Sequence, residues 1–245
     1  MSQVPLKVKI FADGADLKTM LQLAEEPWVQ GFTTNPTLMN KAGVRDYRQF
    51  GKDVLAAITD RPISFEVFSD EFDEMERQAL EIASWAANVY VKIPVTNTRR
   101  ESSLDLVERL SCQGVKVNVT ALMTVRQVVE VVDRVRDGAP SCISVFAGRI
   151  ADTGRDPVPL MAAAVEVVNT APRAELIWAS PRELLNVFQA DAVGCHVITA
   201  TQDILKKMPL VGRDLDDYSL DTVQMFYRDA VAAGFTLSPT RTASQ

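Results

Sequence analysis

The chain has 245 residues, of which 47% are hydrophobic and 24% are charged, and its formal net charge is −6. This length suits one large hydrophobic core, and the acidic balance argues against nucleic acid or an anionic membrane as a partner. No apolar run approaches the roughly 20 residues of a membrane span. The first residues, MSQVPLKVKIFADG, lack the apolar stretch of a secretory signal, so we expect a cytoplasmic protein.

Eight short runs rich in β-branched and aromatic residues predict eight strands. Their first residues lie about 20–30 residues apart, which leaves room for one helix after each strand. In chain order the runs are VKIFAD, GFTTN, ISFEVF, VYVKIP, VKVNVT, CISVFAG, ELIWAS and CHVITA.

Segments with helical period separate these runs. In residues 69–88 the period predicts an inward face of Phe72, Met75, Leu80, Ile82 and Trp85. In residues 124–138 it predicts an inward face of Val125, Val128, Val129, Val132 and Val135. Residues 219–235 predict a last helix.

Strands that alternate with helices over this length predict a single-domain (β/α)8 barrel. A doubly wound open sheet is the rival, but its nucleotide-binding form has G-x-G-x-x-G after the first strand, where this chain reads ADGADLK. No linker or shift in composition divides the chain. We therefore expect one catalytic domain over residues 1–237, including the last helix, and a disordered tail over residues 238–245.

Cysteine and histidine usage argues against a metal centre and against disulfides. Cys112, Cys142 and Cys195 are far apart without C-x-x-C spacing. His196 is the only histidine, and it stands in the apolar run CHVITA. One histidine makes a His-rich metal site or a Ser-His-Asp triad hard to build. A metal-dependent aldolase or isomerase is therefore disfavoured, and no metal site is predicted.

Lys92 stands inside the apolar run VYVKIPVT, where a buried ammonium group is costly. A structural ion pair with Glu66 is one explanation, although buried ion pairs add little stability. The other explanation is chemical. Burial favours the neutral amine, which attacks carbonyl carbons and forms a Schiff base. A protonated Schiff base withdraws electrons from the neighbouring carbon–carbon bond without a metal.

The active site of a (β/α)8 barrel lies at the carboxyl ends of its strands. Nearly every predicted strand carries a polar residue there. These residues are Asp13, Thr33, Thr34, Asn35, Glu66, Lys92, Asn118, Thr120, Ser144, Arg149, Ser180, Arg182, Thr199 and Thr201, with Phe146 beside them. Polarity at a strand end also arises simply because the end approaches solvent.

The residue types suggest a division of roles around Lys92. Asp13 and Glu66 are the candidate acid and base, and environment can divide that work between them. Thr120 is the candidate to hold a water between the lysine and an acid. Thr33, Asn35, Asn118 and Ser144 suit substrate hydroxyls, and Arg149, Ser180 and Arg182 suit an anion such as phosphate.

Six motifs, FTTNPTLM, SFEVF, YVKIPVT, KVNVTAL, ISVFAGRI and WASPRE, appear in order within about Lys9 to Met208. With these motifs the chain resembles the transaldolase family, in particular its short members, which include the fructose-6-phosphate aldolases. The resemblance implies a class I aldolase barrel without a cofactor, and homo-oligomers (pentamers or decamers) in which the last helix packs on a neighbour. It also implies the Schiff-base lysine at Lys92, the acid/base aspartate at Asp13 and the substrate asparagine at Asn35. The strand-six serine falls on Ser144, and the phosphate-binding positions fall on Arg149, Ser180 and Arg182.

Glu66, Asn118 with Thr120, and Phe146 resemble the transaldolase branch, because the aldolase branch usually has Gln and Tyr in place of Glu66 and Phe146 and lacks the asparagine. The implied reaction moves a dihydroxyacetone unit between fructose 6-phosphate and sedoheptulose 7-phosphate, with erythrose 4-phosphate and glyceraldehyde 3-phosphate as aldehydes. An aldolase that releases dihydroxyacetone, a sulfosugar transaldolase and an inactive sugar-phosphate-binding barrel are the alternatives.

Two motifs depart from the family pattern. The first strand reads FADGAD where the family more often has LDT, and the seventh reads ASPR where an aromatic usually separates the serine from the basic residue. Pro181 predicts an extended conformation at Ser180. We expect Pro181 to alter the shape of the anion-binding pocket.

Overall fold

The computed structural model describes residues 6–237. The chain divides between Lys206 and Lys207 into two compact units. The boundary predicted at residues 1–237 stays a prediction, and the tail predicted at residues 238–245 lies outside the described residues.

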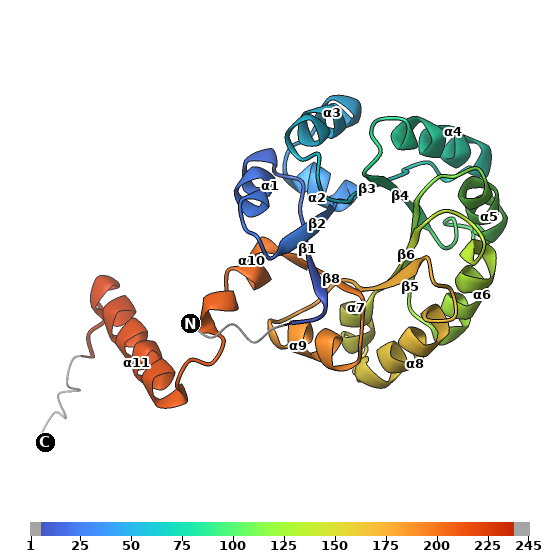
Figure 1. Ribbon diagram of the computed structural model, residues 1–245. Coiled ribbons are helices and arrows are strands. Elements are labelled where there is room, and N and C mark those ends of the chain that lie inside the picture. Colours follow the sequence, from blue (N-terminus) through green and yellow to red (C-terminus); the bar gives the residue numbers. More distant parts are fainter. Residues whose placement is uncertain (1–5, 238–245) are drawn as a thin grey trace, which may run out of the picture. The chain divides into compact units, whose positions relative to one another are not determined.

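The first unit is a closed barrel of eight parallel strands, which follow one another around the barrel in chain order (Figure 1). The predicted (β/α)8 fold is therefore confirmed. The strands are β1 (Lys9–Asp13), β2 (Val29–Thr33), β3 (Ile63–Glu66), β4 (Val89–Pro94), β5 (Val117–Leu122), β6 (Ser141–Val145), β7 (Ala174–Trp178) and β8 (Val197–Thr201).

Helices form the outer ring around these strands (Figure 1). They are α1 (Leu17–Ala24), α2 (Pro36–Lys41), α3 (Tyr47–Ala57), α4 (Phe72–Ala83), α5 (Leu104–Cys112), α6 (Val125–Val135), α7 (Ala147–Ala151), α8 (Val158–Val168), α9 (Leu185–Ala192) and α10 (Gln202–Leu205). Polar residues start several of them. Thr124 and Gln127, for example, form a reciprocal capping box at α6.

The inward faces of α4 and α6 were predicted in part. Met75, Ile82, Val128, Val132 and Val135 are buried, but Leu80 and Val129 are 44% and 40% exposed. Successive helical residues are rotated by about 100°. Leu80 therefore turns away from the stripe of Met75 and Ile82, and Val129 turns away from that of Val128 and Val132. The prediction for these two residues was wrong.

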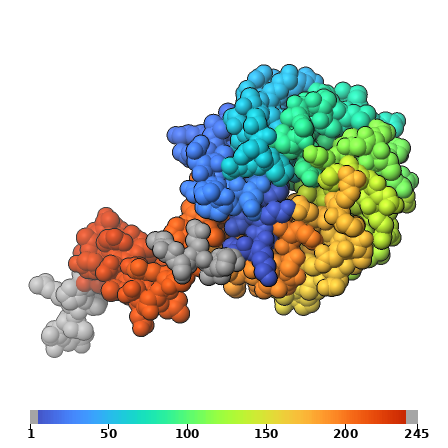
Figure 2. Space-filling view, in the orientation of Figure 1, coloured from blue at the N-terminus to red at the C-terminus, as the bar shows by residue number. Residues whose placement is uncertain are grey.

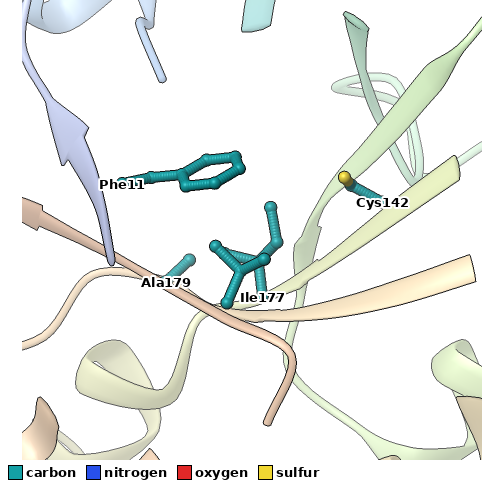
Figure 3. Close-up of a cluster of buried hydrophobic side chains, with 5 residues drawn as sticks. Phe11, Cys142, Ile177 and Ala179 are labelled. Atoms are coloured by element: carbon teal, nitrogen blue, oxygen red, sulfur yellow. The ribbon is translucent and has the colours of Figure 1, made fainter. Parts of the chain in front are cut away.

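An apolar plug fills the barrel below the strand ends. Phe11 extends into the centre beside Cys142, Ile177 and Ala179 (Figure 3), and Val197 belongs to the same buried cluster. Gly31 makes room for the ring, since a Cβ there would lie 2.6 Å from Phe11. In the space-filling view, atoms from many parts of the sequence close over the middle of the barrel (Figure 2). Strand side chains alternate between faces, so the residues two positions beyond the plug also face the interior.

The second unit contains a 3-10 helix (Met208–Leu210) and α11 (Leu215–Ala232). The last helix was expected at residues 219–235, and it begins earlier because Asp214 caps it at Asp216 N and Asp217 N. Among residues 6–237, no helix combines the length and apolarity that crossing a membrane requires.

Candidate active site

Lys92 is the centre of the polar cluster at the barrel mouth. Its side chain is 7% exposed, and its Nζ lies 3.2 Å from Glu66 Oε2. Nζ also donates a hydrogen bond to the carbonyl oxygen of Thr34 at 3.0 Å. Glu66 and Lys92 stand opposite each other in the β3–β4 register. The structure thus places a buried amine within reach of one carboxylate and one backbone acceptor.

Glu66 is itself held by a residue that the sequence did not single out. The Tyr47 hydroxyl at the start of α3 donates to the Glu66 carbonyl oxygen at 2.6 Å. The Tyr47 ring packs against Phe68 and Trp85, with centroids 5.3 and 6.0 Å away. Burial raises the pKa of Tyr47, so its hydroxyl keeps its proton and remains a donor. No local signal in the sequence connects this tyrosine with Glu66.

Asp13 ends β1 and is the second carboxylate at the mouth. Thr33 Oγ1 donates to Asp13 Oδ1 at 2.8 Å. Burial raises the pKa of Asp13, the Glu66 charge adds to the rise, and the Lys92 charge and the Thr33 hydrogen bond oppose it. A carboxyl with raised proton affinity suits reversible proton transfer better than an ordinary aspartate does.

Asn118 and Ser144 form a buried hydrogen-bonded pair on neighbouring strands. Ser144 Oγ donates to Asn118 Oδ1 at 2.7 Å, and Asn118 Nδ2 donates to Ser64 Oγ at 3.0 Å. Ser64 was not among the predicted site residues. The sequence could have indicated Ser64, because it lies two residues before Glu66 and the two side chains therefore share one face of β3.

Thr120 is placed at the same mouth, two residues beyond Asn118 on β5. Its hydroxyl is buried and has no hydrogen-bond partner among the described residues. Next to it, Ala121 has φ 65°, and the β5–β6 register shifts between Val119 and Leu122. Such a bulge re-aims a side chain near a site. A buried hydroxyl without a partner is costly, so it is a natural position for a bound water or substrate oxygen.

Asn35 has a structural contact that the sequence interpretation did not include. It is the N-cap of α2, and its Oδ1 accepts a hydrogen bond from Leu38 N at 2.9 Å. Pro36 follows at the first helical position, where its missing N–H is harmless. The cap leaves the Asn35 amide NH2 as the group that can donate to a ligand.

The three predicted anion-binding residues lie on or beside α7. The Arg149 guanidinium lies 5.7 Å from the centroid of the Phe146 ring, and Phe146 packs on the apolar plug. Arg182 is not free, because its Nε donates to Asp152 Oδ1 at 2.9 Å and its Nη2 donates to the other carboxylate oxygen. The guanidinium keeps its Nη1 edge for another acceptor.

Ser180 was expected to be extended before Pro181, but it has φ 60°. The physical reason is a close approach between loop and helix. The Ser180 carbonyl lies so near Gly148 that a Cβ there would be 1.6 Å from the oxygen. Packing on α7 overrides the local preference set by the proline. The prediction of an extended Ser180 was therefore wrong.

His196 is half-buried, and two of the three cysteines lie in the core, whereas Cys112 is exposed. His196 Nδ1 accepts a hydrogen bond from Leu176 N at 3.1 Å, and burial lowers the pKa of this histidine. Cys142 and Cys195 are buried free thiols. Within residues 6–237, no three His, Cys, Asp or Glu side chains are grouped so that they could hold a metal ion.

Comparisons with known proteins identify the family of the chain. Residues 10–239 match the family model described as "Transaldolase/Fructose-6-phosphate aldolase". The chain is 34% identical over 218 residues to "Probable transaldolase 2" of Listeria monocytogenes, covering 87% of this chain and 95% of the relative. It is 34% identical to a "Probable transaldolase" of Streptococcus agalactiae (87% and 97%) and 32% identical to one of Methanococcus maripaludis (87% and 97%).

Proposed function

Since the chain belongs to the transaldolase/fructose-6-phosphate aldolase family and is a transferase of the aldolase class, we propose that it is a transaldolase of the pentose phosphate type. It transfers a dihydroxyacetone unit from a ketose phosphate, fructose 6-phosphate or sedoheptulose 7-phosphate, to an aldose phosphate. The observation that carries the proposal is Lys92, a buried amine 3.2 Å from Glu66 at the mouth of the barrel.

The first half of the reaction forms the Schiff base. Lys92 gives a proton to Glu66, and the neutral amine attacks the ketose carbonyl at C2. Loss of water from the carbinolamine leaves a protonated imine. A water held by Thr120 carries protons between Glu66 and the leaving hydroxyl, and the unpartnered Thr120 hydroxyl supports this role.

The second half breaks and makes a carbon–carbon bond. Asp13 takes the proton of the C4 hydroxyl, the C3–C4 bond breaks, and its electron pair moves into the iminium to form an enamine. The aldehyde leaves, and an acceptor aldehyde takes its place and is attacked by the enamine. Asp13 then returns its proton to the new hydroxyl, and water hydrolyses the resulting imine, which releases the ketose product and the Lys92 amine. The iminium is the electron sink, so the scheme uses no metal and no cofactor.

Polar neighbours of Lys92 orient the donor. The Asn118–Ser144 pair and the Asn35 amide bind hydroxyls of the three-carbon unit, with Thr33 beside Asp13. Arg149, the Nη1 edge of Arg182 and Ser180 bind the distal anion. Phosphate is the proposed head group, and a sulfonate has the same tetrahedral set of acceptor oxygens. A cytoplasmic location suits this substrate class.

A homo-oligomer, pentameric or decameric, is part of the proposal. Within its own unit, α11 buries none of its side chains. Its apolar residues cover most of its circumference, while Asp217, Asp221, Gln224 and Arg228 share the remaining face. An isolated helix of this kind gains stability by packing, and a second copy of the chain is the proposed partner.

The test is covalent trapping. Incubation with fructose 6-phosphate followed by borohydride is expected to leave a three- or six-carbon adduct on Lys92, located by mass spectrometry of peptides. Lys92→Met should abolish the adduct and activity, whereas Lys52→Met, on the exposed side of α3, should retain both. No adduct with this donor or with its sulfonated analogue would overturn the assignment of Lys92 and favour a binding protein.

The same trapped state separates a transaldolase from an aldolase. After the first aldehyde is removed, the three-carbon adduct of a transaldolase persists in buffer and is discharged by glyceraldehyde 3-phosphate or erythrose 4-phosphate. An aldolase loses the adduct to water and releases dihydroxyacetone without an acceptor. The rate of loss without acceptor is the quantity to measure.

A further inference from the structure

A hydrogen-bonded chain leads from β8 to Asp13. Thr199 stands on β8 opposite Phe11 of β1, one layer below Asp13, and it is 5% exposed. Its Oγ1 lies 2.5 Å from Thr33 Oγ1. Thr33 Oγ1 in turn lies 2.8 Å from Asp13 Oδ1. Three side chains from three strands, β8, β2 and β1, are thus connected by two short contacts.

The number of hydroxyl protons determines which group donates in each of these two hydrogen bonds. A threonine hydroxyl carries one proton. The carboxylate of Asp13 accepts only, so the Thr33 proton is committed to Asp13. The contact between the two hydroxyls is therefore a hydrogen bond only if Thr199 donates and Thr33 accepts. The order is Thr199 to Thr33 to Asp13.

We propose that Thr199 is a positioning residue that holds the Thr33 hydroxyl in the rotamer that donates to Asp13 Oδ1. With Oδ1 occupied, Oδ2 is the oxygen that receives the proton of the substrate hydroxyl. This inference rests on the proposed role of Asp13 as the base for bond cleavage. Thr199 touches neither the substrate nor the reacting atoms in this scheme.

The surroundings of Thr199 argue against a role in packing alone. Thr199 is paired with Phe11 of the apolar plug in the β1–β8 register, and Val197 of the plug lies two residues before it on the same face of β8. Valine has the same shape and would fill the same space, whereas a hydroxyl among apolar groups is costly without a partner. Thr33 is the partner that the described residues provide.

The consequence is a change in how Asp13 binds protons. The charges that act on Asp13 are Lys92 and Glu66, and neither is altered by a change at Thr199. In Thr199→Val, the Thr33 hydroxyl loses its donor and rotates more freely, so its hydrogen bond to Asp13 weakens. The carboxylate is then less stabilised. The pKa of Asp13 should therefore rise. The acid limb of the kcat profile, where kcat falls because Asp13 becomes protonated, should move to higher pH by about 0.5–1 unit.

The experiment compares pH profiles of kcat for the intact oligomer with Thr199→Val and with Thr199→Ser, which keeps the hydroxyl. The valine variant should show the shifted limb with an unchanged KM, and the serine variant should restore the original profile. Borohydride trapping on Lys92 should succeed in both. An unmoved limb in the valine variant, or an equal loss in both variants, would assign Thr199 to packing and overturn the proposal.

A second variant keeps the test valid if Thr199→Val fails to fold. Thr33→Val removes the donor to Asp13 directly and is expected to shift the acid limb at least as far. Thr199→Ala, which also removes the hydroxyl, should shift the acid limb on its own but add no shift to Thr33→Val, whereas an added shift would contradict the hydrogen-bonded chain. If the wild-type protein forms no adduct on Lys92, the proposed function fails, which is distinct from failure of the role of Thr199.

Discussion

Several polar side chains at the barrel mouth lie in environments that are energetically unfavourable for them. Lys92 is buried, the Thr120 hydroxyl has no hydrogen-bond partner within residues 6–237, and burial raises the pKa of Asp13. Each feature has a free-energy cost for the folded state that a smaller or less polar residue would avoid. Such costs are typical of sites selected for activity, so stability and activity should respond in opposite directions to substitution.

Asp13→Asn should stabilise the protein at neutral pH while activity falls by about 10²-fold or more. The raised pKa means that the folded state binds a proton more tightly than the unfolded state does. The stability contribution of Asp13 is therefore present below about pH 4 and is lost as pH rises through the folded-state pKa. Thermal unfolding of both proteins at several pH values should show the larger Tm for the variant at pH 7 and convergence near pH 4.

Asp16→Asn is the control for this prediction, with the opposite sign. Hydrogen bonds from Thr19 at the start of α1 lower the pKa of Asp16. Its contribution is present above the unfolded-state pKa and is lost as pH falls, so the substitution should lower Tm at pH 7. A Tm of Asp13→Asn below that of the wild type at pH 7 would contradict the interpretation of Asp13.

Thr120→Val should leave stability unchanged or raise it by up to about 1 kcal/mol, because a buried unsatisfied hydroxyl is removed. Activity should fall by about 10²-fold if the hydroxyl holds the water of Schiff-base formation. Urea unfolding and steady-state kinetics measure the two effects. Thr34→Val is the matched stability control, since the Thr34 hydroxyl donates to Ser64 O at 2.8 Å and its loss should destabilise by about 1 kcal/mol.

Contacts between elements, rather than single residues, shape the anion end of the site. The helix α7 and the loop after β7 meet where Gly148 touches the Ser180 carbonyl, and Asp152 at the end of α7 holds Arg182. Arg149 belongs to the same helix. Displacement of α7 relative to the loop would therefore move all three proposed anion-binding residues together.

Gly148→Ala tests this contact. The new Cβ would lie 1.6 Å from a backbone oxygen, so the loop or the helix must shift. We expect a loss of stability of about 1–3 kcal/mol and a KM for phosphorylated donors raised more than kcat is lowered. Gly14→Ala is the stability control, because no atom lies within 4 Å of its Cβ. Equal unfolding curves for wild type and Gly148→Ala would show that the contact is easily relaxed.

At the scale of the whole molecule, the two units have different sources of stability. The barrel closes on itself through eight strands and has an apolar plug, whereas the second unit contains one long helix and no buried residue in it. Hydrophobic burial is the main favourable term in folding. We therefore expect α11 to gain stability from the proposed contact with a second copy of the chain.

A pair of charged substitutions on α11, Val223→Asp with Phe226→Asp, should reduce the assembly to smaller species. The two side chains are apolar and 59% and 62% exposed, and a desolvated carboxylate in an interface is strongly unfavourable. Light scattering coupled to size-exclusion chromatography measures the mass. Gln224→Glu, on the polar face of the same helix, should leave the mass unchanged. A monomeric wild-type protein would contradict the proposed oligomer.

The sequence alone determined the barrel and the identity of the residues at its mouth. Short apolar strand runs, spaced by helices, leave few ways to bury all apolar faces, and parallel strands bring their carboxyl ends to one rim. Lys92, Glu66, Asp13 and Asn118 could therefore be predicted from their places in the runs. Helix faces were predicted less well, as Leu80 and Val129 illustrate, because several rotations of an apolar helix satisfy one periodicity.

Only the tertiary structure decided which side chains meet. Tyr47 reaches Glu66, Ser64 reaches Asn118, Asp152 holds Arg182 and Thr199 reaches Thr33, and each of these pairs is brought together by closure of the barrel or packing of its helices. Ser180 departs from its local preference for the same reason. Local sequence sets backbone preferences of about 1 kcal/mol, and contacts between distant segments outweigh them because they bury more surface and satisfy more polar groups.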